Sequence, residues 1–501
     1  MKTAHQRQQA LSTYSRFLNT PLDERLQESL ATDSKSAVLA LFQDVVKTVP
    51  AYKQFLLDQA IAPESIQTLD QFQTLPLITK ENYIQRYPLA ARCRHGTLES
   101  CDMIAVSSGS TGQPTSWPRS FTDELQIATR FEQIFHDSFE ADRKSTLAII
   151  CFALGTWVGG MYTASCCRYL AQKGYEITVI TPGNNKAEIL RMVQTLGGTF
   201  EQVVLLGYPP FLKDVIDTGI SQGLEWSQYR VKLVMAGEVF SEEWRDLVSD
   251  RLGSQCSYHN SASLYGTADA GVIGNETPLS ICIRRFLAAK PEAAQALFGE
   301  SRLPTLVQYD PTSRFFEVNE GQLIFSGDNG IPLLRYNIRD TGGIIPYADM
   351  LTFLAAYGYD PTAKFVTDRG LRPFPFVYVF GRSDFTISYF GANIYPENVA
   401  VGLEQPEIRD WVTGKFVMQV KADADQDRYL SVVVELAPGE SKNDQRRQRV
   451  VASILKQLLR LNSEFASYVP PSYQQPRVTL VETGDRDYFP SGVKHRYTRQ
   501  S

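Results

Sequence analysis

The sequence predicts an α/β protein, with a large N-terminal domain of layered sheets and helices and a small α+β domain at its C-terminal end. Three observations support this fold class. The chain has 501 residues, whereas a single domain usually has roughly 100–200. Short apolar runs alternate with helix-length amphipathic segments between residues 146 and 253. Beyond residue 320 the pattern changes to strand-like pieces separated by turns.

Helices are predicted for residues 22–60, before the alternating region begins. The runs "LQESLA" and "AVLALFQDVVKTV" place apolar residues three and four positions apart, which is the spacing of one helix face. Pro50 directly follows the second run and is expected to end it.

The alternating region predicts a parallel sheet layered by helices, because buried parallel strands appear as short apolar runs linked by amphipathic helices. The predicted strands are "TLAIIC" at 146–151, "EITVI" at 176–180, "QVVLLG" at 202–207 and "VKLVMAG" at 231–237. The linking segment "SEEWRDLVSDRLG" at 241–253 shows the helical pattern. Ser241 can cap its first turn, and Gly253 can end it. Trp244 and Val248 share one apolar face.

The segment "FGRSD" at 380–384 is interpreted as a junction between two domains. The predicted domains are residues 1–381 and residues 382–501. The second has the length of a compact domain. Its predicted elements are strands in "FVMQVKAD" at 416–423, "RYLSVVVELA" at 428–437 and "RVTLVETGDR" at 477–486, with a helix in "DQRRQRVVASILKQLLRLNSEF" at 444–465.

Composition excludes several classes of protein. The net charge is −5, which does not support a nucleic-acid surface, since such a surface needs a concentrated basic face. No run approaches the roughly 18–20 apolar residues that span a bilayer. The N-terminal segment lacks the apolar core of a secretory signal. The seven cysteines are odd in number and irregularly spaced, which argues against a disulfide framework. We therefore expect a cytoplasmic protein.

A loop of small polar residues, "VSSGSTGQPT" at 106–115, follows the apolar strand-like piece "MIAV" at 103–106. Successive backbone N–H groups in such a loop can form an anion-binding nest, and glycine lets the backbone approach the ligand closely. By itself, such a loop is more typical of a surface turn. Other segments of the chain must decide between a turn and a phosphate-binding loop.

Five further segments follow this loop in a fixed order: "VMAGEVF" at 234–240, "SLYGTADAG" at 263–271, "LLRYNIRDTG" at 333–342, "GRSDFTISYFGANIYPENV" at 381–399 and "SGVKHRY" at 491–497. Together with the loop, they resemble the motifs of the adenylate-forming superfamily of acyl-CoA synthetases, adenylation domains and luciferases. Within that superfamily the chain looks most like the phenylacetate–CoA ligase branch, which Thr115 fits.

The resemblance implies a ligase that uses ATP, Mg²⁺ and coenzyme A. An aryl or arylacetic carboxylic acid would attack the α-phosphate to give an acyl-AMP, and coenzyme A would then accept the acyl group. It also implies that the small C-terminal domain is mobile and turns about a hinge near residues 382–384. Two alternatives stay open. The acceptor can instead be an amine, a carrier-protein thiol or a coenzyme phosphate, or the chain can be a nucleotide-binding protein with degraded catalysis.

The resemblance assigns the triphosphate to the loop, through Ser107, Ser108, Gly109, Ser110, Thr111 and Gly112. Adenine is expected against the backbone of Gly237 and Glu238. For the segment at 234–240 the alternative is a strand-to-helix turn. For the loop at 106–115 the alternative is the surface turn already described.

In "SLYGTADAG", Tyr265 and Gly266 match the family pattern, and Thr267 stands beside the hydroxyl position, which is Ala268. Asp269 occupies the position of the family's Mg²⁺-binding glutamate. A carboxylate is a sound ligand for Mg²⁺, although this one is a methylene shorter. An ordinary turn is the alternative here.

In "LLRYNIRDTG", Asp340 would bind the two ribose hydroxyls, because a carboxylate can accept two hydrogen bonds at once. Arg335 and Arg339 are expected to pair with phosphate or with Asp340, and Arg339 is a candidate catalytic residue. Arg382 would reach ribose or phosphate. For "LLRYNIRDTG" the alternative is a surface ion pair, and for the segment around Arg382 it is a β-turn.

Lys494 is the candidate adenylation lysine, expected to bridge the substrate carboxylate and the ribose. The family places glycine directly before this lysine, whereas Val493 intervenes here, so His495 and Arg496 are competitors. A basic tail is the alternative. Ala268, Asp269 and the displaced Lys494 are the features that favour degraded catalysis.

The acid pocket is expected near "GYPPFL" at 207–212 and "AGEVF" at 236–240, by resemblance. The resemblance also allows a homodimer, since members of this branch often form dimers. Cys256, His259 and Cys282 could begin a structural zinc site, but no fourth ligand with convincing spacing is present.

Overall fold

A computed structural model gives the structure of the chain. It describes residues 4–99, 101–107, 114–255, 257–299, 303–365, 367, 369–382, 386–437, 439–489 and 497–498.

The chain forms two compact units, which are described separately below. The large unit comprises Met1–Val106, Ser116–Gly207 and Val215–Gly381. The small unit comprises Ser107–Thr115, Tyr208–Asp214 and Arg382–Ser501. Two short segments that are distant in sequence therefore group with the C-terminal part of the chain.

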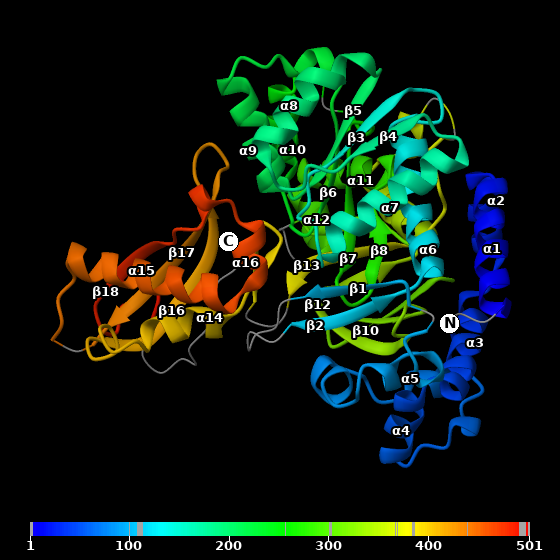
Figure 1. The fold of residues 1–501 in the computed structure, drawn as a ribbon, viewed down its shortest axis with the longest axis horizontal. Coiled ribbons are helices and arrows are strands. Elements are labelled where there is room, and N and C mark those ends of the chain that lie inside the picture. The colour runs from blue at the N-terminus through cyan, green and yellow to red at the C-terminus, as the bar shows by residue number, and fades with distance from the viewer. Residues whose placement is uncertain are drawn as a thin grey trace. The chain divides into compact units, whose positions relative to one another are not determined.

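The main sheet of the large unit has the strand order β10-β11-β12-β13-β9-β8-β7-β6-β5-β3-β4 (Figure 1). Its strands are β3 (Thr146–Ile150), β4 (Ile177–Ile180), β5 (Gln202–Gly207), β6 (Lys232–Ala236), β7 (Ser261–Thr267), β8 (Gly271–Asn275), β9 (Thr305–Gln308), β10 (Arg314–Asn319), β11 (Gln322–Gly327), β12 (Leu333–Ile345) and β13 (Phe376–Arg382). A separate pair joins β1 (Met103–Ser107) to β2 (Thr115–Arg119).

The part of the sheet from β4 to β7 is parallel, as the alternating apolar runs predicted. Its central strands β3 and β5 are buried along their whole length, which explains why they read as continuous apolar runs. The linking helices are α6 (Phe121–Gln133), α7 (Val158–Lys173), α8 (Lys186–Leu196), α9 (Pro209–Ser221) and α10 (Glu242–Arg251). In α10 the Ser241 side chain accepts a hydrogen bond from the backbone N–H of Trp244, so the predicted cap is confirmed.

The N-terminal helices are α1 (Ala4–Asn19), α2 (Leu22–Ala31), α3 (Ser34–Thr48), α4 (Pro50–Asp58) and α5 (Leu69–Gln73). The helical character predicted for residues 22–60 is confirmed. Pro50 ends one helix and is the first residue of the next, where its missing N–H costs nothing. A core cluster joins α3 and α4 to strands β11 and β12 through residues such as Phe42, Phe55 and Tyr336.

From β7 onwards the pairs β7–β8, β8–β9, β9–β13, β10–β11 and β11–β12 are antiparallel, and three more helices accompany them: α11 (Pro278–Ala288), α12 (Pro291–Phe298) and α13 (Tyr347–Ala356). A second core cluster holds them to β9 and β13 through Leu279, Leu306 and Phe376. The change from parallel to antiparallel pairing occurs at β7, where the "SLYGTADAG" motif lies.

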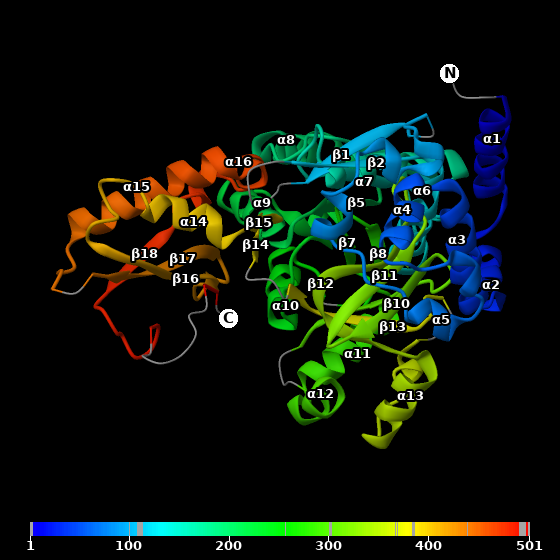
Figure 2. The ribbon, with the colours of Figure 1, turned by 90° about the horizontal axis from the view of Figure 1, so that it is seen from below.

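The small unit contains the sheet β16-β17-β18, formed by β16 (Val412–Ala422), β17 (Arg428–Leu436) and β18 (Arg477–Val481). Helices α14 (Pro396–Leu403) and α15 (Asp444–Leu461) pack against each other and cover one face of it (Figures 1 and 2). The remaining elements are α16 (Ser463–Tyr468) and the hairpin of β14 (Ile387–Tyr389) and β15 (Ala392–Ile394). The three strands predicted for this part of the chain are confirmed. The helix predicted for residues 444–465 ends at Leu461, because Asn462 caps a second helix, α16.

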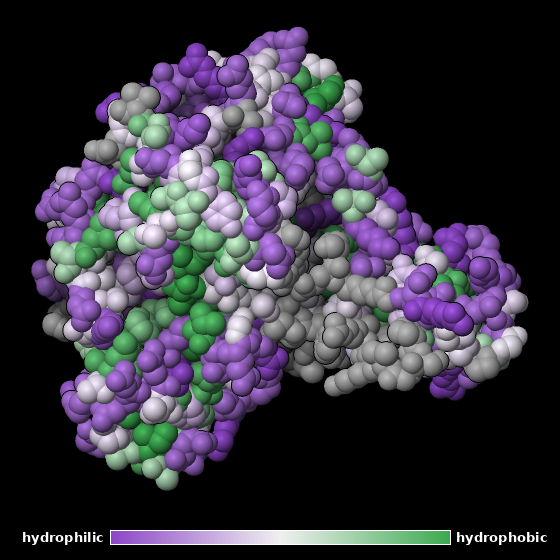
Figure 3. All heavy atoms as spheres, turned by 180° about the vertical axis from the view of Figure 1, so that it is seen from behind, coloured by the Kyte–Doolittle hydropathy of each residue, from purple (hydrophilic) through white to green (hydrophobic). Residues whose placement is uncertain are grey.

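No helix in the described part of the chain combines the length and the apolar character that a bilayer crossing needs. Hydrophilic residues cover much of the face drawn in Figure 3, with hydrophobic residues in smaller patches between them. The large exposed hydrophobic residues come from different elements, for example Leu11 on α1, Leu57 on α4 and Val318 on β10.

Candidate active site

The hairpin of β7 and β8 presents Asp269 in a tight loop of small residues. Gly266 pairs with Val272 across the hairpin, and a Cβ atom on Gly266 would lie 2.6 Å from the carbonyl oxygen of Gly271. Gly271 has a φ of 72°, which side chains rarely permit. The Thr267 hydroxyl oxygen accepts a hydrogen bond from the backbone N–H of Ala270 at 3.1 Å. The loop is therefore closed by its own short-range contacts.

Strand β12 carries the "LLRYNIRDTG" motif and is irregular there. Its pairing with β11 is interrupted around Arg335 and again around residues 338–340. Arg335 and Arg339 have left-handed backbone angles, with φ of 49° and 65°. Such angles cost a non-glycine residue about 1–3 kcal/mol and persist only where the surrounding structure imposes them. Bulges of this kind redirect side chains and are frequent beside active sites.

Two reciprocal tyrosine–aspartate hydrogen bonds join these motifs. The Tyr265 hydroxyl donates to Asp340 Oδ2 at 2.7 Å. The Tyr336 hydroxyl donates to Asp269 Oδ2. Each motif therefore supplies one tyrosine and one aspartate, and each tyrosine binds the aspartate of the other motif. The two candidate carboxylates, one for ribose and one for Mg²⁺, are brought to the same part of the large unit.

The two carboxylates differ in their surroundings. Asp340 is buried, and the Tyr265 ring that binds it stacks with Phe316 at a centroid distance of 6.5 Å. Asp269 is half-buried, and within the described part of the chain its Oδ1 atom has no hydrogen-bond partner. The carboxylate that the sequence assigns to the metal is thus the more accessible of the two.

Arg335 does not bind Asp340 as one prediction allowed. Its Nε atom lies 3.1 Å from Glu317 Oε2 in a buried ion pair, and it also donates to the carbonyl oxygen of Leu75. Burial raises the pKa of Glu317, although the charge of Arg335 acts to lower it. Arg335 therefore holds β12 to the segment around Leu75.

Arg339 is only partly buried, and its Nη2 atom lies 2.5 Å from Glu81 Oε2. Both side chains of this ion pair keep a substantial exposed fraction. The backbone N–H of Arg339 donates to the Asn337 side chain at 2.8 Å. A long, partly exposed arginine of this kind can exchange a carboxylate partner for a phosphate.

The predicted adenine segment lies directly after β6. Gly237 has a φ of 85°, Glu238 is buried, and Val239 is exposed between Glu238 and the buried Phe240. The Phe240 ring lies between two guanidinium groups, 5.0 Å from that of Arg245 and 5.5 Å from that of Arg284.

A buried charge network fixes the end of this segment. Arg284 donates to the carbonyl oxygen of Phe240, and Arg245 Nε lies 3.0 Å from Glu242 Oε2. Burial alone would raise the pKa of Glu242, but Arg245 and Arg284 outweigh it and lower that pKa. Glu242 therefore stays ionised at the beginning of α10, and the backbone that leads into α10 is held in place.

Several predicted site residues lie outside the described residues. They are Ser108, Gly109, Ser110, Thr111, Gly112, Lys494, His495 and Arg496, together with the hinge residues Ser383 and Asp384. The backbone of Arg382 ends β13, but its side chain is not described. Ser107 is described and buried at the end of β1. The structure therefore describes only the strands that flank the predicted phosphate loop, β1 and β2.

Arg119, at the end of β2, is a residue that sequence reasoning missed. It is almost fully buried, and its Nη2 atom donates to the carbonyl oxygens of Ala268 and Asp269, the latter at 3.1 Å. Nothing local marks "SWPRS" as part of a site, because the carbonyls that it binds are about 150 residues away. Tyr336 was missed as well, although it stands inside a quoted motif.

The residues considered for zinc have other contacts. The Cys282 sulfur lies 3.0 Å from the Tyr359 hydroxyl, and burial raises the pKa of this thiol. His259 packs edge-on against Phe365, and burial lowers its pKa. Cys256 lies outside the described residues. Within the described residues Cys282 and His259 belong to no cluster of metal-ligating side chains.

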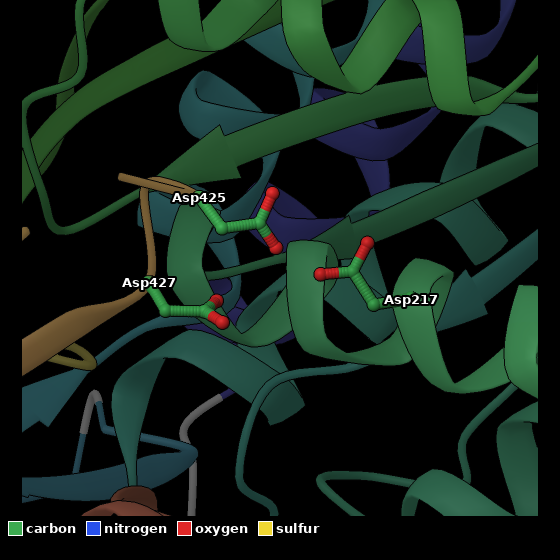
Figure 4. Close-up of side chains that lie close together, drawn as sticks. All are labelled: Asp217, Asp425 and Asp427. Atoms are coloured by element: carbon green, nitrogen blue, oxygen red, sulfur yellow. The ribbon is translucent and has the colours of Figure 1, made fainter. Parts of the chain in front are cut away.

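Three aspartates are drawn in Figure 4. Asp425 and Asp427 lie in the connection between β16 and β17 of the small unit, where the backbone N–H groups of both donate to the Asp423 side chain. Asp217 lies on α9 in the large unit. Because the residues belong to different units, we assign no metal site to them.

No protein-family model matches the sequence, and no curated protein matches it. The fold, by contrast, is similar to solved structures of 2-hydroxyisobutyryl-CoA ligase. The structure of that enzyme with 2-HIB-AMP and CoA in the thioesterification state has a TM-score of 0.63 and 13% identity, covering 97% of this chain and 92% of that one.

Two other states of the same ligase have lower scores. The postadenylation state with R3-HIB-AMP has a TM-score of 0.53 and 14% identity, with coverages of 97% and 92%. An open conformation with 2-HIB-AMP and CoA has a TM-score of 0.52 and 13% identity, with coverages of 96% and 93%. At such low identity the likeness establishes the fold, and the predicted α/β fold class is confirmed.

Proposed function

We propose that this protein is an AMP-forming ligase, which activates a carboxylic acid with ATP and transfers the acyl group to coenzyme A. The observation that carries the proposal is the reciprocal pairing of Tyr265 with Asp340 and of Tyr336 with Asp269. It unites two motifs that the resemblance assigns to one nucleotide site. The fold supports the proposal, because it is shared with a CoA ligase solved with an acyl-AMP and CoA.

The nucleotide would be held by its two ends. Asp340 accepts hydrogen bonds from the ribose hydroxyls, and Tyr265 keeps its carboxylate in place. Adenine lies against the backbone of Gly237 and Glu238, where the left-handed glycine turns the chain away from β6. The triphosphate binds to the loop that comprises Ser107, Ser108, Gly109, Ser110, Thr111 and Gly112.

Asp269 would be a ligand of Mg²⁺, with Gly266 and Thr267 beside the α-phosphate. The donor fits the ion, since Mg²⁺ prefers carboxylate oxygens and Asp269 Oδ1 has no partner among the described residues. The bound ion supplies charge neutralisation for the phosphates. The protein contributes further positive charge through Arg339, Arg382 and Lys494.

The reaction needs two arrangements of the same active site. The carboxylate oxygen of the acid attacks the α-phosphorus, the bond to pyrophosphate breaks, and Lys494 stabilises the charge on the reacting groups. A thiolate of coenzyme A then attacks the acyl carbon and displaces AMP. Residues 1–381 and 382–501 are proposed as the two domains, with a hinge near 382–384 that exchanges the two arrangements.

The proposed substrate is an aryl or arylacetic acid, as in the phenylacetate–CoA ligase branch. By resemblance, its pocket is expected near residues 207–212 and 236–240. A homodimer is proposed on the same resemblance. An amine, a carrier-protein thiol or a coenzyme phosphate is the alternative acceptor.

Acid-dependent exchange of pyrophosphate into ATP tests the first half-reaction. A library of aryl, arylacetic and short hydroxy acids should be assayed with Mg²⁺, first without and then with coenzyme A. Exchange with one class of acid, followed by thioester formation, is expected. Exchange without a thioester would identify another acceptor. Absence of exchange together with retained ATP binding would identify a degraded homologue and refute the proposal.

Replacing Lys494 with alanine tests the assignment of the lysine. The substitution should suppress exchange by about 10²–10³-fold, because a charge that stabilises the transition state is removed. Nucleotide affinity, measured by calorimetry, should change much less. The neighbouring substitution Arg496→Ala is the matched control, and a larger effect of that control would move the role to Arg496.

A further inference from the structure

The loop that carries Asp269 is held by two residues from other elements. This loop, residues 267–270, consists of small residues apart from Asp269 itself. Arg119 reaches it from β2, and Tyr336 reaches it from β12. Neither residue belongs to the set that we assign to the nucleotide or to the metal.

Arg119 binds the backbone of this loop. Its side chain is 1% exposed, so its charge is removed from water and must be compensated by the protein. It donates to the carbonyl oxygens of two successive residues, Ala268 and Asp269, whereas its Nε atom has no partner within the described residues. An arginine that donates hydrogen bonds to two successive carbonyl oxygens fixes the orientation of the peptide groups that carry them.

The position of Arg119 along the chain adds to this argument. It ends β2, the strand that leads out of the candidate phosphate loop, and the capped helix α6 begins two residues later at Phe121. Arg119 therefore ties the backbone of the metal-binding loop to the strand that follows the phosphate loop.

Tyr336 binds the side chain instead. Its ring is buried in the core cluster that also contains Tyr52 and Tyr83, and its hydroxyl donates to Asp269 Oδ2. The hydrogen bond fixes the rotation of the carboxylate. It leaves Oδ1 as the atom without a partner in the described part of the chain.

We infer that Arg119 and Tyr336 are positioning residues that together orient Asp269 as a ligand for the magnesium ion of the nucleotide. The inference rests on the proposed function. The backbone contact sets where the loop lies, and the hydroxyl contact sets which carboxylate oxygen faces the ion. Outer contacts of this kind orient metal ligands, and their loss typically reduces metal affinity or activity about 10–100-fold.

A rigid ligand also has consequences for the choice of metal. Mg²⁺ demands nearly ideal octahedral geometry at short distances, whereas Ca²⁺ tolerates flexible arrangements at longer ones. Loosening Asp269 should therefore weaken Mg²⁺ binding more than Ca²⁺ binding. A change in the ratio of the two affinities would not follow from a general loss of stability.

The experiment compares Tyr336→Phe, Arg119→Lys and Arg119→Met with the unaltered protein. Metal binding is measured without turnover, by titrating Mg²⁺ or Ca²⁺ into protein saturated with a non-hydrolysable ATP analogue and following the heat released. The Mg²⁺ dependence of pyrophosphate exchange is measured in parallel. We expect Tyr336→Phe and Arg119→Met to weaken Mg²⁺ about 10–100-fold, with a smaller effect on Ca²⁺. Arg119→Lys should restore part of the affinity.

Two matched controls are available in the chain. Tyr83→Phe removes a buried hydroxyl of the same core cluster that has no partner in the described residues. Arg92→Met removes a buried guanidinium whose Nε and Nη1 atoms likewise lack described partners. Thermal unfolding of all variants shows whether they remain folded.

Metal affinities and Mg²⁺-to-Ca²⁺ ratios that change no more in the test variants than in the controls would overturn the inference. Equal losses of affinity for Mg²⁺ and for Ca²⁺ in the test variants would also overturn the inference. Failure of the proposed function is distinguishable from both results. In that case the unaltered protein shows no acid-dependent exchange, whereas the metal titrations still report on Arg119 and Tyr336.

Discussion

Asp340 and Asp269 make the same kind of contact in different surroundings. Each accepts a hydrogen bond from a tyrosine hydroxyl that belongs to the other's motif. Asp340 stands on an irregular strand, is buried, and lies beside the stacked ring of Tyr265. Asp269 stands in a hairpin loop, is half-buried, and depends on Arg119 for the position of its backbone.

The difference indicates how a fold can support two candidate ligand-binding carboxylates. Asp340 lies on a strand and is buried, and Tyr265 donates a hydrogen bond to its carboxylate. Asp269 lies in a loop and is half-buried, and residues from two other strands contact its backbone and its side chain. The proposed roles agree with this division, because a ribose is a fixed part of the nucleotide, whereas a metal ion demands precise ligand geometry.

The largest expected effect separates the two carboxylates directly. Asp340→Ala and Asp269→Ala should each lower pyrophosphate exchange by about 10²–10³-fold, since each removes a group that positions the reacting phosphate. An acyl-sulfamoyl-adenosine, which lacks the metal-binding phosphates, should bind more weakly to the Asp340 variant only. Fluorescence or calorimetric titration measures this affinity. Equal losses in both variants would mean that the two aspartates do not have separate roles.

A third carboxylate shows what burial does without a tyrosine donor. Asp123 lies in the first turn of α6 and accepts a hydrogen bond from the Ser120 N–H at 2.9 Å. Burial raises its pKa to about 6, against the effects of Ser120 and of the nearby Arg119. The facing Arg314 also lowers this pKa, and the facing Asp328 raises it. Burial is the dominant influence on this group.

This pKa predicts how stability depends on pH. The folded state binds the proton more tightly than the unfolded state, so Asp123 costs stability as pH rises from about 4 to about 6, and the cost stays constant above that. Asp123→Asn avoids the cost and keeps an acceptor for Ser120. Relative to the unaltered protein, it should gain up to about 3 kcal/mol between pH 4 and pH 7. Chemical denaturation at several pH values measures the gain, and a pH-independent difference would contradict the assignment.

A smaller effect is expected from Tyr265→Phe. It leaves the Asp340 carboxylate charged but without the hydroxyl that orients it, so nucleoside affinity should fall about tenfold. The Mg²⁺ affinity of the saturated complex should stay close to that of the unaltered protein. If Tyr265→Phe instead altered metal affinity as strongly as Tyr336→Phe, the two reciprocal pairs would be acting as one unit.

The smallest effect on stability is expected at the partly exposed ion pair of Arg339 and Glu81. Removing either partner should change the free energy of unfolding by less than about 1 kcal/mol, because solvent screens such pairs. Pyrophosphate exchange should fall in Arg339→Ala and stay unchanged in Glu81→Ala, since only the arginine is proposed to bind phosphate. If the two variants had equal activities, Arg339 would have no role beyond its ion pair with Glu81.

The sequence by itself determined the elements and their order. Buried strands read as continuous apolar runs, and the cap of α10 follows from Ser241 and the helical face behind it, because these signals depend on neighbouring residues. The alternation of strands and helices was enough to predict the parallel sheet. The order of the motifs was enough to nominate Asp269 and Asp340.

Only the tertiary structure decided which side chains meet. Tyr265 and Asp340 are 75 residues apart, and Tyr336 and Asp269 are 67 apart, so no local pattern could pair them. Arg335 was expected near phosphate or Asp340 and instead forms a buried ion pair with Glu317, because the bulge in β12 redirects it. Arg119 gave no sign of its role, since its partners are carbonyl groups, which every residue has. Periodicity and capping act over a few residues, whereas these contacts exist only after the chain has folded.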